Sequence, residues 1–589
     1  MMIRKPYLIT QAVKAYITAS VLTLTMGQLN GFIDSVFMGQ VVGPDALSAI
    51  TLSMPLINMV TMIYILFGVG ASILTSAAIG NRDYKRASAI FSVSMVSTIL
   101  ASVVFSAFAW MGRGWLTGLI CHDRQLYPLA LDYVGWAMML SFTTVISQTL
   151  SQFTDVDGRP NRVMKAMVLT MLTNVLLDVV LVLVFGLGVA GSAMATAASF
   201  LVSGLYLVFY MAKESRTYRL MLKIDHFWTL LADNMKNGGA YVFIMLLGAL
   251  TVLFYNSVVL DRLGPDGMFA LSVGSGMLSI GSLFTNGAFQ AFIAVGGMLY
   301  GQKDYKGMHL LFVRCLSITL AAAIGFMLFS LCFPELLVRL FGAETPELIS
   351  SSSSALRIMS LMYLPFLTMA AIPAVYQVLG HLKLVGLMGG LYYGLLVLTI
   401  WLMSKTDSPA NLWWSFPIAG WSGVLFCQLV VWREHRKLPG TSRVTLIPNV
   451  SPFRHLLDIS VRAEQKAVEE AMVEVHAFVV SLQLPSESTS LNIEVCTEEM
   501  LLNIVQHSEV RENHYIDLRI TDSDDEVMLI LKDDGRPFDP TAVQQKNMGL
   551  GLLLARSLCS KMEYNFMYGQ NASFLSWQKN KQDEAAATQ

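Results

Sequence analysis

Two carboxylates lie within long apolar segments of the chain, where ionisable side chains are costly and usually functional. Asp34 and Asp178 are these residues, and Asn174 precedes Asp178 by four positions, so it shares one helix face with it. Two carboxylates and an amide oxygen that converge could hold Na⁺ through oxygen ligands. They could also relay a proton, because neighbouring carboxylates do not readily stay ionised together. The alternative is that backbone or hydroxyl groups near helix ends satisfy each acid separately.

A second set of polar side chains recurs every four residues near the C-terminal end. Glu499, Asn503 and His507 therefore share one face of a predicted helix. The Asn503 amide oxygen could ligate Mg²⁺, and Glu499 could act as a general base toward a water or hydroxyl. Taken alone, this pattern also fits a solvated polar helix face.

Two glycine-containing motifs follow that helix in the sequence. Asp533, at the end of a predicted strand, can accept a hydrogen bond from an adenine amine, and Gly535 lets the backbone approach the ring. Gly549 and Gly551 open a predicted helix whose first N–H groups could bind phosphates. In this order the three motifs predict an ATP site, although a lone Gly-x-Gly is more often a turn.

The elements that position these residues divide the chain into two unlike parts. Of the 589 residues, 54% are hydrophobic and only 14% charged, whereas soluble domains carry about 25% charged residues. The net charge of −1 gives no support for a nucleic-acid partner. Twelve segments are long and apolar enough to cross a bilayer, at approximately 8–38, 46–78, 88–112, 127–154, 161–185, 190–212, 236–261, 267–299, 307–333, 348–379, 384–404 and 411–433.

Basic residues gather in alternate loops between these segments. They follow the second, fourth, sixth and twelfth segments, whereas the loops after the first and fifth have none. The positive-inside rule then places both termini in the cytoplasm. We therefore expect a multi-pass protein of a bacterial inner membrane, surrounded by membrane lipid, with its C-terminal domain exposed to cytoplasmic ATP.

The chain repeats itself at a constant displacement. Gly43-Pro44-Asp45 recurs as Gly264-Pro265-Asp266, and Gly80-Asn81-Arg82-Asp83-Tyr84-Lys85 recurs 221 residues later from Gly301 to Lys306. Six helices separate the copies, so the two repeats, about 1–225 and 226–434, share one orientation, as in alternating-access transporters. Tyr255 and Thr399 stand at the places that correspond to the two acids, which predicts that coupling chemistry lies in the first half.

The first 434 residues resemble the multidrug and toxic compound extrusion (MATE) family. The resemblance rests on Ile33–Gly39, Gly43–Leu47 and the run from Asn174 through Gly188-Val189-Ala190-Gly191 to Thr196. It implies Na⁺- or H⁺-driven export of small organic, often cationic, compounds, with a cation site at Asp34, Asn174, Asp178 and Thr196. Two departures are that the seventh and tenth helices carry no acid, and that the first and seventh lack the proline that family members often have.

The segment 453–578 resembles the GHKL ATPase superfamily, and within it the anti-sigma-factor serine kinases. The three motifs carry the likeness, together with an ending that runs from Met562 to Asn571. The resemblance implies binding of ATP and Mg²⁺ and an anti-sigma-antagonist-like protein partner. Pro537 replaces a glycine usual in the second motif, and the segment between Asp539 and Gly549 is short. Binding of ATP is therefore better supported than its turnover.

These observations predict an all-α membrane protein of twelve helices in two six-helix repeats, followed by an α/β GHKL-like sandwich domain. Residues 435–452 form a linker, and 579–589 a polar tail. The predicted function is a cation-coupled antiporter with an ATP-binding regulatory or serine-kinase domain, in which Glu499 is the base. A tail that binds ATP without phosphotransfer is one alternative. Another is a membrane-anchored kinase whose helix bundle senses a ligand and no longer transports.

Overall fold

The computed structural model describes residues 4–121, 124, 126–215, 217–221, 223–341, 343–484, 486–507, 514–543 and 549–579, with the side chains of Pro44, Leu47, Pro265 and His507 left out. The chain divides into two compact units. The membrane unit comprises Tyr16–Asp304 and Phe312–Pro448. The sheet unit comprises the chain up to Ala15, the short stretch Tyr305–Leu311, and the chain from Asn449 onward.

Long apolar helices build the membrane unit. Within the described residues, eleven of them could each cross a membrane, or twelve when the pair α6 and α7, bent by 46°, counts as one span. This confirms the predicted twelve-helix architecture. The first half contains α1 (Tyr7–Val41), α2 (Pro44–Tyr64), α3 (Gly70–Gly80), α4 (Tyr84–Met111), α5 (Arg113–Ile120), α6 (Tyr127–Met139), α7 (Ser141–Val156), α8 (Pro160–Asp178) and α9 (Gly188–Lys213).

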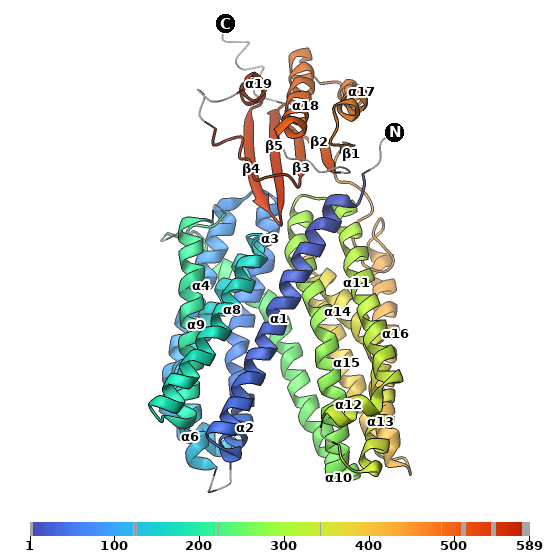
Figure 1. Cartoon of the computed structure of the whole chain (residues 1–589). Helices are drawn as coiled ribbons and strands as arrows, with labels where there is room; N and C mark the ends of the chain where they lie inside the picture. The colour runs from blue at the N-terminus through green and yellow to red at the C-terminus, as the bar shows by residue number, and fades with distance from the viewer. Residues whose placement is uncertain are drawn as a thin grey trace. The chain divides into compact units, whose positions relative to one another are not determined.

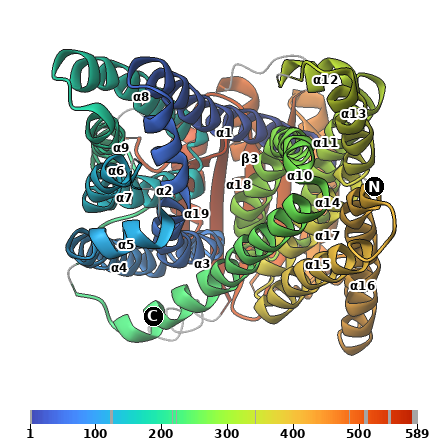
Figure 2. The same cartoon turned by 90° about the horizontal axis from the view of Figure 1, so that it is seen from below.

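The second half follows the same plan. It contains α10 (Phe227–Gly301), α11 (Tyr305–Cys332), α12 (Pro334–Leu340), α13 (Pro346–Ser360), α14 (Tyr363–Val378), α15 (Leu382–Met403), a 3₁₀ turn (Pro409–Trp414) and α16 (Ser415–Lys437). Seen along the helices, α4–α9 and α11–α16 form two separate groups (Figure 2). Helix α10 is two spans joined at Gly264, whose φ of 65° is not helical. Its counterpart Gly43, between α1 and α2, also has a positive φ, of 120°.

The two halves approach each other closely at residues that the repeat makes equivalent. A Cβ atom on Gly80 would lie 2.1 Å from the Met298 carbonyl oxygen and 2.9 Å from Gly301 Cα. A Cβ atom on Gly301 would lie 2.2 Å from the Ala77 carbonyl oxygen. Equivalent residues can touch only at the axis that relates them, so a pseudo-twofold axis passes between these two glycines. This contact supports two halves that can rock about a common line.

A five-stranded antiparallel sheet organises the sheet unit. Its strand order is β1-β2-β3-β5-β4, with β1 (His455–Arg462), β2 (Tyr515–Asp522), β3 (Glu526–Asp533), β4 (Lys561–Met567) and β5 (Gln570–Gln578). Helices α17 (Gln465–Ser481), α18 (Glu487–His507) and α19 (Leu550–Leu558) lie on one face of it (Figure 1).

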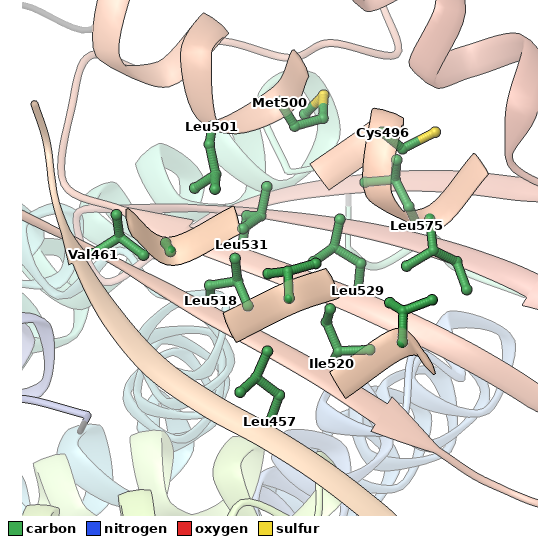
Figure 3. Close-up of a cluster of buried hydrophobic side chains, with 14 of the residues drawn as sticks. Leu457, Val461, Cys496, Met500, Leu501, Leu518, Ile520, Leu529, Leu531 and Leu575 are labelled. Carbon is green, nitrogen blue, oxygen red and sulfur yellow. The ribbon is translucent and has the colours of Figure 1, made fainter. Parts of the chain in front are cut away.

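The core of this unit lies between that face and the helices. Alternate strand residues point to opposite faces, so Leu518, Ile520 and Leu529 point toward Cys496 and Met500 of α18 (Figure 3). The other face of the sheet carries polar and charged side chains. The result is the two-layer α/β domain that the sequence predicted.

Gly80→Ala is predicted to destabilise the membrane unit. Its methyl group would force the halves apart, and overpacking costs about 1–3 kcal/mol. Thermal unfolding of the detergent-solubilised protein would measure a lower midpoint. Gly325→Ala is the matched control, because a Cβ there meets no atom within 4 Å. Equal effects from the two substitutions would contradict the role given to the Gly80 contact.

Candidate cation site and nucleotide site

The Asp34 and Asp178 side chains meet inside the membrane unit. Their carboxyl groups, from α1 and α8, lie within electrostatic reach of each other, and Ser192 Oγ of α9 donates to Asp34 Oδ1 over 3.0 Å. Two carboxylates in contact cannot both remain charged without a counter-charge. A proton or a bound cation therefore has to accompany this pair.

Two buried oxygens beside this pair have no hydrogen-bond donor among the described residues. They are Asn174 Oδ1 and Asp178 Oδ1, and their side chains are only 1% and 2% exposed. The Asn174 amide nitrogen donates to Thr196 Oγ1 over 3.4 Å, which brings the fourth predicted residue into the set. Buried acceptors without donors are costly, and oxygen ligands are what a hard cation requires. The residues present therefore fit a small cation.

The backbone is irregular at the same place. Helix α8 ends at Asp178 and continues as a π-helical turn over Val179–Val184, and such turns occur frequently at functional sites. Sequence reasoning missed two members of the site. Ser192 could have been found, because it precedes Thr196 by four residues on one helix face. Tyr133 of α6, which lies within electrostatic reach of both acids, gave no signal in the sequence.

The corresponding region of the second half is a hydrophobic cluster. Tyr255 lies edge-on to Phe416, with ring centroids 5.6 Å apart, and Thr399 Oγ1 donates to the Leu396 and Ser415 carbonyl oxygens. The positions displaced by 221 from Asn174 and Ser192 are Leu395 and Trp413, which belong to the same cluster. The second half retains the helices and lacks the oxygen ligands.

A polar cavity of about 380 Å³ lies within the membrane unit. Its walls carry the amides of Gln148 and Gln152, the Tyr64 hydroxyl and the carboxylate of Asp155. Tyr16 of α1 lies beside Asp155. Apolar side chains complete the lining, so the cavity presents one carboxyl group within a mixed polar and apolar wall.

A smaller cavity of about 210 Å³ lies beside this one, on the side of Thr196. Tyr133 and Thr196 line it, and it shares Thr61, Gln148 and Phe200 with the larger cavity. Gln148 Oε1 is a buried acceptor without a partner among the described residues. The larger cavity and the carboxylate pair therefore lie on either side of one common wall.

A hydrogen bond joins the two halves at the larger cavity. Gln152 Oε1, in the first half, accepts from Tyr64 OH over 3.1 Å and from Gln290 Nε2 over 2.9 Å. Gln290 lies on α10, in the second half. Separation of the halves at this level has to break the bond between Gln152 and Gln290, so occupancy of the cavity and movement of the halves are physically connected.

In the sheet unit, the predicted adenine-binding residue is held in place by its neighbours. Asp533 is 7% exposed and accepts from the Gly535 N–H and from Asn571 Nδ2, both over 2.8 Å. Burial raises the pKa of Asp533, and these two hydrogen bonds oppose the shift. The Asn571 side chain also contacts the backbone of Gly535, Arg536 and Phe538. Sequence reasoning quoted Asn571 in the ending motif without giving it this role.

The predicted base and the predicted phosphate turn are in contact. A Cβ atom on Gly551 would lie 1.9 Å from Glu499 Oε2, so a side chain at this position would displace the carboxylate. Gly549 caps the N-terminus of α19, and α18 packs against both α19 and β3. Asn503 lies one turn beyond Glu499 on the same face of α18. His507 ends α18, but its side chain lies outside the described part of the structure, as do residues 544–548 before Gly549.

Comparisons with known proteins agree with this division of the chain. The MatE family profile matches residues 19–180 and 241–401, one stretch in each half and together more than half of the chain. The profile described as histidine kinase-like ATPase domain matches residues 461–572.

Curated relatives match a shorter part of the chain. The multidrug export protein MepA of Staphylococcus haemolyticus (strain JCSC1435) is 24% identical over 204 residues, which cover 35% of this chain and 44% of that protein. The MepA protein of Staphylococcus aureus (strain MRSA252) is 25% identical over 194 residues, covering 33% and 43% respectively. The aligned part therefore spans less than half the length of these relatives.

Solved structures share the membrane fold. An outward-facing multidrug resistance MATE family transporter of the MOP superfamily has a TM-score of 0.66 at 20% identity, over 72% of this chain and 96% of its own. A MOP superfamily transporter from Pyrococcus furiosus has a TM-score of 0.67 at 19% identity, over 73% and 97%. With the two profile matches, these findings show that the chain is a multi-pass membrane protein of the MatE family that carries a histidine kinase-like ATPase domain.

Proposed function

We propose that the protein is a cation-coupled antiporter that exports small organic cations, driven by Na⁺ or H⁺ through Asp34 and Asp178. The observation that best supports this proposal is the carboxylate pair, together with the unpartnered oxygens of Asn174 and Asp178. These groups lie behind one wall of a polar cavity. Antiport requires that binding of the ion weakens binding of the substrate, and the reverse. The smaller cavity, which Thr196 of the cation site lines, shares Gln148, Thr61 and Phe200 with the larger one, so filling one site can reposition the wall of the other.

The larger cavity is the proposed place of the substrate. Asp155 supplies a negative charge, the glutamines and Tyr64 supply hydrogen bonds, and apolar side chains supply contact area. Small-molecule sites combine such a lining with a few directed polar groups. A cation that binds Asp155 also lies beside Gln152, whose bond to Gln290 crosses between the halves.

The tail is proposed to be cytoplasmic in a bacterial inner membrane and to act as an ATP-dependent regulator or serine kinase. A histidine kinase-like ATPase domain implies ATP binding. Asp533 and Gly535 would bind the adenine. Gly549 and Gly551 would bind the phosphates. Asn503 would hold Mg²⁺, which neutralises phosphate charge when bound, and His507, at the end of the same helix, would be a further ATP-binding residue. In a kinase, Glu499 would accept the proton of an incoming serine hydroxyl on an anti-sigma-antagonist-like partner.

Asp34→Asn or Asp178→Asn is predicted to abolish gradient-driven export and leave the protein folded, because each removes a charge and keeps the shape. Efflux of a cationic dye from vesicles, with and without a Na⁺ or pH gradient, measures this. Tyr255→Phe, at the equivalent place in the second half, should retain export. Loss of export in Tyr255→Phe would contradict coupling in the first half, and a wild type without dye flux would favour the ligand-sensing alternative.

Asp155→Asn is predicted to weaken binding of the cationic dye tenfold or more, because a charge-assisted contact is worth about 1.5–3 kcal/mol. Fluorescence titration of the purified protein measures the affinity. Asp34→Asn should retain binding at saturating dye, since its defect lies in coupling. Dye affinity unchanged in Asp155→Asn would exclude this cavity as the substrate site.

In the tail, Asp533→Asn and Asn571→Ala are both predicted to lower ATP affinity roughly tenfold. Asp533→Asn alters the acceptor that faces the adenine amine. Asn571→Ala removes the amide that holds the Asp533 carboxylate in place. Glu499→Ala should bind ATP and lose only phosphotransfer, because a base acts in the transition state. Asn565→Ala, on the neighbouring strand, is the matched control. ATP affinity retained in Asp533→Asn would refute the assignment of the nucleotide site.

A further inference from the structure

The N-terminal residues 4–8 belong to the sheet unit by their contacts, although some 450 positions separate them from it in sequence. These residues, here named the N-terminal clasp, lie on the polar face of the sheet, opposite the helices. Every contact described below joins the clasp to β1, β2, β5 or the residues next to β2 and β3.

The first contact is a cation placed between two buried carboxylates. Arg4 Nη1 lies 3.4 Å from Asp458 Oδ1 on β1, and Arg4 Nε lies 3.4 Å from Asp517 Oδ2 on β2. The three side chains are 4–6% exposed. Burial raises the pKa of Asp517, and Arg4 acts against the shift. Beside them, Ser460 Oγ donates to Asp517 over 2.6 Å and accepts from the Lys5 N–H over 2.8 Å. Removal of one partner from a buried ionic group is strongly destabilising, so this face requires the clasp.

The second contact reaches the loop that follows β3. Tyr7 OH donates to Asp534 Oδ2 over 3.0 Å, and His514 Nδ1 lies 2.8 Å from the other oxygen of the same carboxylate. The Tyr7 and His514 rings also pack, with centroids 5.5 Å apart. Gln570 Nε2 donates to the Leu8 carbonyl oxygen over 2.5 Å. The clasp thus holds residues on two separate strand ends.

Those strand ends are also the ends that form the nucleotide motif. Asp533 and Asn571 are partners in the β3–β5 register, and Asp533 is two residues beyond Leu531, which belongs to the core on the helix side. Their immediate neighbours Asp534 and Gln570 contact the clasp on the polar face. The end of β3 and the start of β5 therefore have the proposed nucleotide residues on one face of the sheet and the clasp on the other.

The clasp leads directly into the first membrane helix. Helix α1 begins at Tyr7 and runs without proline to Val41, and Asp34 lies on it. From Tyr7 to Asp34 the helix is about 40 Å long, at 1.5 Å per residue. The same helix is therefore fixed to the nucleotide-binding strands at its start and carries a ligand of the proposed cation site further along.

We propose that the N-terminal clasp couples nucleotide occupancy of the ATPase domain to helix α1 and thereby regulates transport. The inference rests on the proposed function, since it needs a transporter and a tail that binds ATP. ATP and the clasp both hold the 533–536 and 570–571 backbone in one conformation, so each strengthens binding of the other. Coupling of this kind is reciprocal by thermodynamic necessity.

Arg4→Gln in the full-length protein tests the first half of the proposal. We expect ATP affinity to fall threefold or more, although Arg4 lies on the face of the sheet opposite the nucleotide motif. Arg454→Gln is the matched control, because it breaks an exposed ion pair of the same domain with Asp524, and such pairs contribute little. Tyr7→Phe, which removes one hydroxyl, should shift the affinity in the same direction. ATP affinity unchanged in Arg4→Gln, or equally lowered in Arg454→Gln, would overturn the proposal.

Reconstituted vesicles test the second half. ATP supplied on the side of the tail should change dye export at least twofold in the wild type and in Arg454→Gln. Arg4→Gln should export at its basal rate whether or not ATP is present at saturation. A normal response to ATP in Arg4→Gln, or bound ATP without effect on wild-type export, would refute transmission through the clasp. A wild type that binds no ATP would instead refute the proposed function of the tail, and the inference with it.

Discussion

The contact between two carboxylates inside the membrane unit is the constraint on which the proposed mechanism depends. Asp34 and Asp178 come from helices that are far apart in the sequence, and they are brought together where water is scarce. Such a pair is tolerated only with a proton or a cation. The unpartnered oxygens of Asn174 and Asp178, and the π-helical turn that follows, fit the ion site that we propose. Packing alone would not select this arrangement.

The near-symmetry of the two halves makes their difference informative. Close packing at Gly80 and Gly301 preserves the pseudo-twofold axis, so both halves keep the helices that rocking requires. Their interiors have diverged, since the second half fills the place of the ion site with Trp413, Tyr255 and Leu395. Under the proposed function, a single ion site would make the first half the one that responds to the gradient. The second half then supplies a partner surface, including Gln290, against which the response acts.

Sequence reasoning succeeded where a residue is unusual in its surroundings. Asp34 and Asp178 stand out because charge is rare in apolar helices, and the twelve spans follow from hydrophobicity alone. It failed where a role arises from tertiary contact. Ser192 and Tyr133 are ordinary residues for a membrane helix, and Asn571 gains its role only when β5 pairs with β3. Strands β1, β4 and β5 were not predicted, because their short polar-alternating segments are a weaker pattern than a helical repeat.

The clasp gives a physical reason for the fusion of these two domains in one chain. A separate ATPase domain would have to find the transporter by diffusion and would leave Asp458 and Asp517 without Arg4. Within one chain, the two ends of the sequence meet at a high effective concentration, so weak contacts suffice to keep them together. The buried Arg4 then lends specificity, because a neutral segment in its place would remove the cation that faces both Asp458 and Asp517. A segment that both completes the sheet face and begins helix α1 is therefore well placed to pass a change in one domain to the other.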